Sequence, residues 1–192
     1  MGAATEKTPW LAEGEEKRAI VREMFADVAP TYDLVNSLMC FRLHHRWRKE
    51  AVRALDLKVG ARALDVCCGT GDFLAPLGKA VGLEGEVVGV DFCEPMLEVA
   101  RAKMPGAELS LGDACRLPFA GGQFDAGTVG WGLRNVPDVG LALREAARVL
   151  KRGGRFVSLD MARPRSRYVG RAGELVFQKV VPVIGRVFGK SQ

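Results

Sequence analysis

Two glycines that follow a short apolar run are the first residues of this chain that suggest chemistry. Residues 61–66 read ARALDV and lead into Cys67-Cys68-Gly69-Thr70-Gly71-Asp72. Gly69 and Gly71 permit a tight turn and let a ligand approach the main chain where a Cβ would block it. A helix that begins at about Asp72 offers free N–H groups beside that turn. The segment therefore predicts a loop that holds a nucleoside-type ligand.

Carboxylates recur after the next two apolar runs. Asp91 follows Gly71 by 20 residues, a spacing that places a carboxylate beside the ribose hydroxyls of a bound nucleotide. Asp113 ends a further β-rich run, where an exocyclic amine can donate to it. A dinucleotide fingerprint needs a third glycine at position 74, and Leu74 disfavours NAD and FAD. Any single aspartate can cap a helix or turn, but three in this order favour a ligand site.

The cysteines and histidines form neither a disulfide pattern nor a zinc pattern. The chain has 5 cysteines without a C-x-x-C pair, and its only histidines are the neighbours His44 and His45. We therefore expect no metal site, and we interpret Cys67 and Cys68 as small packing residues. Free cysteines are typical of the reducing cytoplasm, which is the expected location.

Short β-rich runs alternate with helical patterns through the centre of the chain. We expect strands over 61–66, 85–91, 107–111, 124–131 and 155–161, with a last helix from about Asp138 to Leu150. Strands separated by helices make right-handed parallel crossovers, so the sequence predicts an open α/β sheet with helices on both faces. Ligands of such sheets bind beyond the carboxyl ends of the strands.

The length of 192 residues suits one domain, which we divide into three parts. Residues 1–60 form a helical segment, 61–162 the α/β core and 163–192 an amphipathic tail. The tail carries 7 Lys and Arg against 1 acidic residue, whereas the core has 11 basic and 13 acidic residues. On charge alone, the basic tail could equally contact an anionic membrane or nucleic acid. A third interpretation is that the tail is a helix that packs on the sheet and leaves its polar face in solvent.

Several motifs resemble those of known enzymes. Asp65-x-x-x-Gly69-Thr70-Gly71, Asp91 and Asp113-Ala114 are similar to the cofactor pocket of class I S-adenosylmethionine-dependent methyltransferases. Three further motifs resemble those of the ubiquinone/menaquinone biosynthesis C-methyltransferase family. They are Tyr32-Asp33-x-x-Asn36-x-x-Met39-Cys40-x-x-x-His44-x-x-Trp47, Gly132-Leu133-Arg134-Asn135-Val136 and Arg148-Val149-Leu150-Lys151-Arg152-Gly153-Gly154-Arg155-Phe156. The resemblance runs from residue 24 to about residue 190, and it departs from the family pattern at Cys40, Arg42, Arg152 and Asp160.

The resemblance implies a Rossmann-like class I methyltransferase fold, an N-terminal helical lid and S-adenosylmethionine as cofactor. The implied cofactor contacts are Asp65, Gly69, Thr70, Gly71, Asp91, Asp113, Ala114 and Tyr32. The implied reaction methylates a ring carbon of a prenylated quinol, with demethylmenaquinol the expected substrate in menaquinone biosynthesis. Arg134 and Asn135 are the candidate catalytic residues: Arg134 would stabilise a quinolate, and Asn135 would fix a quinol oxygen. The structural alternatives for the pair are a salt bridge and the N-cap of the helix that begins near Asp138. We interpret His44 as a packed structural residue.

Two other functions stay open: methylation of another small molecule or of RNA, and a non-catalytic subunit that keeps the cofactor fold. No nucleic-acid partner is expected, since the sequence has no RNA-recognition motif. We expect a cytoplasmic enzyme that contacts anionic lipid peripherally at the inner face of the membrane. The family pattern continues beyond this C-terminus, so the last strands are expected to be missing, and either a homodimer or the tail should protect the edge strand over 155–161.

Overall fold

Five strands form one sheet in the computed structural model of the protein, which describes residues 14–162. The strands are β1 Arg62–Val66, β2 Glu86–Asp91, β3 Glu108–Leu111, β4 Phe124–Gly130 and β5 Leu150–Leu159. Their order is β3-β2-β1-β4-β5, and every neighbouring pair is parallel. The prediction of an open, parallel α/β sheet is therefore confirmed.

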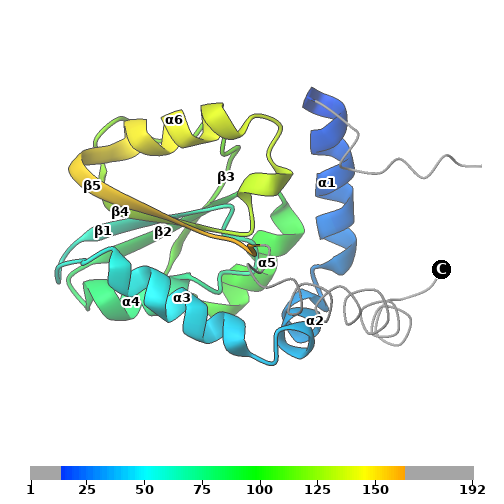
Figure 1. The fold of residues 1–192 in the computed structure, drawn as a ribbon, viewed down its shortest axis with the longest axis horizontal. Helices are drawn as coiled ribbons and strands as arrows, with labels where there is room; N and C mark the ends of the chain where they lie inside the picture. The colour runs from blue at the N-terminus through cyan, green and yellow to red at the C-terminus, as the bar shows by residue number, and fades with distance from the viewer. Residues whose placement is uncertain (1–13, 163–192) are drawn as a thin grey trace, which may run out of the picture.

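Helices cover both faces of this sheet and one of its ends (Figure 1). They are α1 Gly14–Val28, α2 Tyr32–Met39, α3 Leu43–Ala54, α4 Leu74–Val81, α5 Glu94–Lys103 and α6 Val139–Val149, with a 3-10 turn η1 at Leu133–Asn135. In Figure 1, α3 and α4 lie below the sheet and α6 lies above it, while α1 crosses the end of the sheet on the right. The predicted N-terminal helical segment thus comprises three helices in the described residues.

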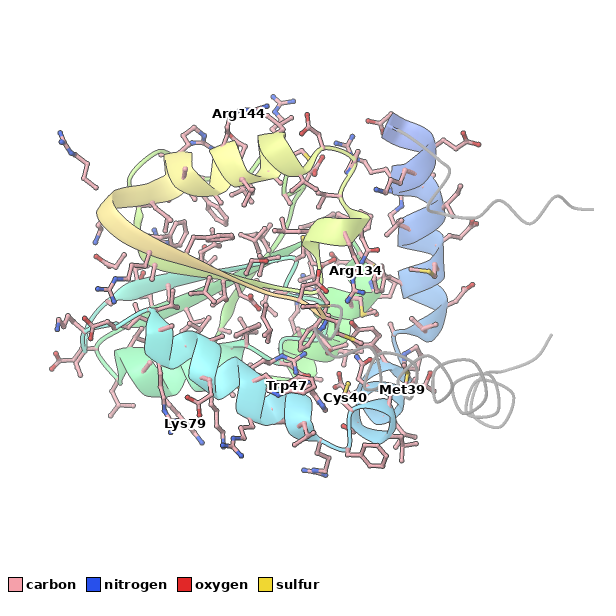
Figure 2. The ribbon with its side chains drawn as sticks, in the orientation of Figure 1. Met39, Cys40, Trp47, Lys79, Arg134 and Arg144 are labelled. Atoms are coloured by element: carbon pink, nitrogen blue, oxygen red, sulfur yellow. The ribbon has the colours of Figure 1, made fainter. Side chains whose placement is uncertain are left out.

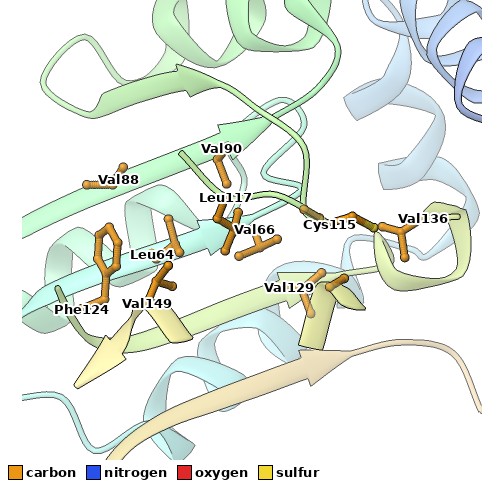
Figure 3. Close-up of a cluster of buried hydrophobic side chains, with 12 residues drawn as sticks. Leu64, Val66, Val88, Val90, Cys115, Leu117, Phe124, Val129, Val136 and Val149 are labelled. Carbon is orange, nitrogen blue, oxygen red and sulfur yellow. The ribbon is translucent and has the colours of Figure 1, made fainter. Parts of the chain in front are cut away.

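The core divides into two apolar layers because successive strand residues point to opposite faces. On one face, Ala63 and Ala126 pack with Leu77 of α4 and Val52 of α3. On the other face, the buried side chains come from β1, β2 and β4, from α6, from the loop that follows β3 and from the residue that follows η1. Figure 3 labels ten of them: Leu64, Val66, Val88, Val90, Cys115, Leu117, Phe124, Val129, Val136 and Val149. The sheet is therefore a buried scaffold, and its strand ends are free to carry a site.

Two element boundaries differ from the predictions. The strand predicted over 155–161 begins at Leu150, directly after α6, and ends at Leu159. Its pairing jumps from Phe124↔Leu150 to Ala126↔Arg155, and the residues skipped by this irregular register include Gly153 and Gly154. The helix predicted from about Asp72 begins at Leu74, since Gly71 has φ +81° and keeps the chain in a turn.

The basic tail over 163–192 lies outside the described residues, and so do the predictions made for it. Within residues 14–162, no helix combines the length and the apolar character that crossing a bilayer requires.

Candidate functional site

A cavity opens where the strand order reverses. The order β3-β2-β1-β4-β5 changes direction between β1 and β4, and ligands of open α/β sheets bind in the crevice outside this point. Residues that follow β1, β2, β3 and β4 line the cavity, among them Cys67, Phe92, Ala114 and Trp131. The structure therefore brings the predicted strand ends together.

The two glycines of the β1 turn have different roles. Both have positive φ, +54° at Gly69 and +81° at Gly71, in the left-handed region that glycine tolerates best. A Cβ at Gly71 would lie 2.8 Å from Cδ1 of Leu74 and 3.1 Å from Cβ of Ala100, so the turn packs tightly on α4 and α5 there. A Cβ at Gly69 would have no described atom within 4 Å. Gly69 thus leaves open space on the outer side of the turn.

Asp91 ties the glycine turn to the start of α5. Its carboxylate is buried and accepts the Gly69 N–H at 2.8 Å and the Cys93 N–H at 2.9 Å. Burial raises the pKa of Asp91, and these backbone hydrogen bonds act in the opposite direction. Asp91 also lines the cavity, as the predicted ribose contact requires.

Asp65 and the three turn residues Gly69, Thr70 and Gly71 are not among the residues that line the cavity. Asp65 is buried and accepts a hydrogen bond from Oγ1 of Thr128 at 2.7 Å. Burial raises the pKa of Asp65 to about 7. The Thr70 hydroxyl donates to Oδ1 of Asp33 on α2 at 2.5 Å. Their predicted cofactor contacts therefore stay predictions.

Asp113 connects the cavity to α1, which closes over it. Its Oδ1 accepts the Cys115 N–H at 2.8 Å, while its Oδ2 forms an ion pair with Arg18. Lys17 adds a second tie by donating to the carbonyl oxygen of Val136 at 3.1 Å. The sequence gives no sign of these two contacts, because nothing in the spacing of Lys17 and Arg18 reveals a partner more than 90 residues away.

Aromatic side chains form the apolar walls. Tyr32 lines the cavity, and its ring lies edge-on to Phe25 of α1 with centroids 6.0 Å apart. Its predicted cofactor contact stays a prediction. Burial raises the pKa of Tyr32, so its hydroxyl stays protonated at neutral pH. Trp131, which sequence reasoning missed, also lines the cavity and has φ +56°, an unusual conformation for a bulky residue. The Arg48 guanidinium stacks over the Trp131 ring at 4.7 Å from its centroid.

Arg134 and Asn135 sit side by side in η1 but face different surroundings. Asn135 lines the cavity, and its Nδ2 donates to the carbonyl oxygen of Trp131 at 3.3 Å. Arg134 does not line the cavity; its Nη2 lies 3.0 Å from Oδ1 of Asp160, and its side chain is half exposed (Figure 2). The N-cap of α6 is Asp138, which accepts the Leu141 N–H at 2.8 Å, so Asn135 does not serve as that cap.

The polar cluster around Asp72 is organised by cations rather than by a metal site. His44, His45 and Asp72 offer ligand atoms within 4.8 Å of one another. However, Asp72 already pairs with Nη2 of Arg48 at 3.2 Å and Nζ of Lys103 at 2.6 Å. Burial lowers the pKa of His44 to about 4, so its ring is neutral at pH 7. We therefore assign this cluster a structural role.

Cys67 and Cys68 are protonated thiols. Burial raises the pKa of both well above the ordinary value. Cys67 has φ +54° and lines the cavity, and a Cβ on Gly132 would lie 2.5 Å from its own Cβ. A neutral, closely packed thiol is a poor nucleophile, which agrees with the interpretation of these cysteines as packing residues.

Comparisons with known proteins place this geometry among methyltransferases. Residues 12–192 match the model of the ubiE/COQ5 methyltransferase family. The chain is 43% identical over 185 residues to the demethylmenaquinone methyltransferase of Staphylococcus saprophyticus, covering 95% of this chain and 79% of that protein. It is 42% identical over 186 residues to the protein of the same name from Desulfitobacterium hafniense, covering 93% and 74%.

Solved structures show the same fold. A SAM-dependent methyltransferase from Thermotoga maritima, described as a possible histamine N-methyltransferase, matches with a TM-score of 0.61 and 28% identity over 83% of this chain and 70% of that chain. The YcgJ protein of a Bacillus species matches with a TM-score of 0.58 and 29% identity, covering 66% of this chain and 55% of that one.

Proposed function

The chain belongs to the ubiE/COQ5 methyltransferase family, and from this premise we propose that it methylates a ring carbon of a prenylated quinol, with demethylmenaquinol as its substrate in menaquinone biosynthesis. The observation that supports this most directly is the cavity at the strand-order reversal, which is lined by two strand-end carboxylates and by aromatic side chains. One of these carboxylates, that of Asp91, accepts the Gly69 N–H of the glycine turn. The names of the relatives from Staphylococcus and Desulfitobacterium support the choice of substrate.

The described residues fit S-adenosylmethionine. The open space outside Gly69 lets a ligand lie against the main chain, and Asp91 presents a carboxylate beside that turn for the ribose hydroxyls. Asp113 offers a carboxylate for the adenine amine, and the small side chain of Ala114 leaves room beside it. Bound S-adenosylmethionine supplies an electrophilic methyl group on a sulfonium.

The walls of the cavity suit a quinol ring. Tyr32 and Trp131 bring aromatic faces to a site that buries apolar surface and excludes water. Asn135 contributes an amide that can hold a quinol oxygen, and its hydrogen bond to Trp131 fixes its orientation. Loss of the phenolic proton makes the ortho carbon of the quinol electron-rich, and the placement of the ring by these residues favours attack from that carbon.

Arg134 is proposed to stabilise the quinolate. Its guanidinium remains charged at any pH of interest, so it acts as a cation rather than as the proton acceptor. In the described structure this cation pairs with Asp160 at 3.0 Å. We propose that Arg134 exchanges this partner for the quinol oxygen, since the neighbouring residue Asn135 already lines the cavity.

The experiment is a transfer assay with methyl-labelled S-adenosylmethionine and demethylmenaquinol. Wild-type protein should label the quinol, while Asp91→Ala and Arg134→Ala should lose most of the rate. Arg144→Ala is the matched control, because Arg144 is an exposed arginine on α6, away from the cavity (Figure 2). Label in the quinol at equal rates in all four proteins would refute the site, and cofactor binding without any label in the quinol would refute the substrate.

We also propose that the enzyme works as a peripheral protein on the cytoplasmic face of a membrane. A prenylated quinol resides in lipid, whereas S-adenosylmethionine is dissolved in water, and an enzyme at the surface meets both.

A further inference from the structure

Five large apolar side chains are exposed where α2 turns into α3. Phe41 is 81% exposed, and the others have exposed fractions from 39% to 50%: Leu34, Leu38, Leu43 and Trp47. We call these five residues the apolar corner. Large exposed apolar side chains that gather on neighbouring elements of a folded protein point to an interaction site.

The spacing of these residues places them on defined helix faces. Leu34 and Leu38 are four residues apart on α2, and Leu43 and Trp47 are four residues apart on α3. Residues at this spacing lie on the same face of a helix. Phe41 stands in the turn between the two helices, so both exposed faces lead to one point on the molecular surface.

The backbone holds Phe41 outward at a cost in strain. Phe41 has φ +47° and Arg42 has φ +60°, two consecutive residues in the left-handed region without a glycine. Hydrogen bonds maintain the turn: the Arg42 N–H donates to the Ser37 carbonyl oxygen at 2.9 Å, and the Leu43 N–H donates to that of Cys40 at 2.8 Å. Strained turns of this type cluster at functional positions.

A basic groove adjoins the apolar corner. It runs between α3 and α4 and is lined by seven Lys or Arg side chains against three Asp or Glu. Four of the cations are exposed and pair with no carboxylate in the part of the chain that the structure describes: Arg42, Arg46, Lys49 and Lys79. Lys79 points away from the sheet on the side where α3 lies (Figure 2). Because Arg42 belongs to both the groove and the turn, the two surfaces are continuous.

We propose that the apolar corner and the basic groove together dock this protein on an anionic phospholipid bilayer. The apolar side chains enter the interface between headgroups and acyl chains, and the four cations meet the headgroups. This inference rests on the proposed function, since a prenylated quinol enters the enzyme from lipid. The same helix that carries Leu34 and Leu38 begins at Tyr32, which lines the cavity, so docking brings the cavity close to the membrane.

The charges favour a membrane over a second copy of the chain. A symmetric dimer through this surface would place like patches against each other and bring the unpaired cations of both copies together. Anionic headgroups instead neutralise them. The partner of this surface is therefore a negatively charged membrane rather than a second copy of the chain.

Binding of the full chain to vesicles tests the docking surface. Phe41→Asn removes the most exposed ring, and asparagine tolerates the left-handed conformation of this position better than phenylalanine, so the turn is retained. Leu83→Asn is the matched control, because Leu83 is a fully exposed apolar residue in the turn between α4 and β2. The vesicles contain phosphatidylglycerol in phosphatidylcholine, or phosphatidylcholine alone.

We expect wild type and Leu83→Asn to bind the anionic vesicles equally, and Phe41→Asn to bind about 10-fold more weakly. Arg46→Ser should reduce the preference for phosphatidylglycerol. Equal binding by Phe41→Asn and Leu83→Asn would overturn the proposal and assign any membrane contact elsewhere, including residues 163–192. A change in oligomeric state on Phe41→Asn would also overturn it, in favour of a second copy.

A water-soluble quinol with a shortened prenyl chain separates this proposal from the proposed function. Without vesicles, wild type and Phe41→Asn should methylate this quinol at the same rate, because the apolar corner is absent from the cavity lining. Absence of methylation in both proteins would contradict the proposed function, and the vesicle measurement would still decide the docking surface.

Discussion

At the scale of single residues, two buried aspartates of neighbouring strands differ in their hydrogen bonds. Asp91 accepts two backbone N–H groups, whereas Asp65 accepts the Thr128 hydroxyl. Backbone donors stabilise the charged form of a carboxylate against the penalty of burial. Asp91 is therefore the better organised anion, and Asp65 is a carboxyl group whose charge depends on pH.

Replacing Asp91 tests the ribose contact. Asp91→Asn keeps the shape of the side chain but removes its charge, and we expect the affinity for S-adenosylmethionine to fall by about 10- to 100-fold, as for a lost hydrogen bond to a charged group. Calorimetric titration measures this. Asp125→Asn is the control: Asp125 also accepts a backbone N–H, that of Arg62 at 2.8 Å, but at the start of β4. Equal affinity in both variants would exclude Asp91 from the cofactor site.

Replacing Asp65 should change how stability depends on pH. The pKa of Asp65 is about 7 in the folded protein against an ordinary value of 3.8. Between these two pH values the Asp65 carboxyl is ionised in the unfolded chain but still protonated in the folded protein. The free energy of unfolding of wild type therefore falls as pH rises from about 4 to 7. The free energy of unfolding of Asp65→Asn relative to wild type should increase by roughly 1–4 kcal/mol from pH 4 to 7 and stay constant above pH 7.

Urea unfolding at a series of pH values measures this difference. A difference that does not vary with pH would mean that folded Asp65 ionises like an exposed carboxyl. The affinity of the same variant for S-adenosylmethionine tests the predicted cofactor contact separately, when it is measured at a pH where the urea curves show the variant to be fully folded.

At the scale of elements, the glycine turn joins β1 to α4 and α5. Gly71→Ala adds a Cβ that would lie 2.8 Å from Leu74 and 3.1 Å from Ala100, at φ +81°. We expect destabilisation of about 1–3 kcal/mol or more, together with loss of cofactor binding. Gly78→Ala is the matched control, because Gly78 lies inside α4 with no described atom within 4 Å of its Cβ. This second variant should gain about 0.5–1 kcal/mol from helix propensity.

Thermal unfolding of the two glycine variants measures both effects. A Gly71→Ala protein as stable as wild type would show that the turn can move away from α5. In that case the close packing at Gly71 would not be what holds the glycine turn in place.

At the scale of the whole molecule, the site combines residues from α1, α2 and four strand ends. A ligand that binds only the folded protein stabilises all of these elements together. At 100 times its dissociation constant, S-adenosylmethionine should add about 2.7 kcal/mol to the free energy of unfolding. For a domain of this size, we expect the midpoint of thermal unfolding to rise by about 5–10 °C.

NAD at the same concentration is the control for this shift. It should leave the midpoint unchanged, since Leu74 occupies the position where a dinucleotide site needs a third glycine. A shift with NAD and none with S-adenosylmethionine would contradict the proposed cofactor. The homodimer expected from the sequence stays a prediction, with β5 at the edge of the described sheet.

The sheet and the common edge of its carboxylates could be predicted from the chain. Apolar runs separated by helical patterns allow parallel crossovers, and parallel strands place all their carboxyl ends on one side, so Asp91 and Asp113 had to approach each other there. The family motifs pointed to the same edge. These features depend on periodicity and spacing, which are local properties.

The enclosure of the site was decided only by tertiary packing. The ion pair between Arg18 and Asp113, the stacking of Arg48 on Trp131 and the exposure of Phe41 each depend on how the N-terminal helices pack against the sheet. Arg134 points to Asp160 for the same reason. Such contacts join residues far apart in the chain, and their geometry follows from the summed packing of many side chains, which no spacing of residues encodes.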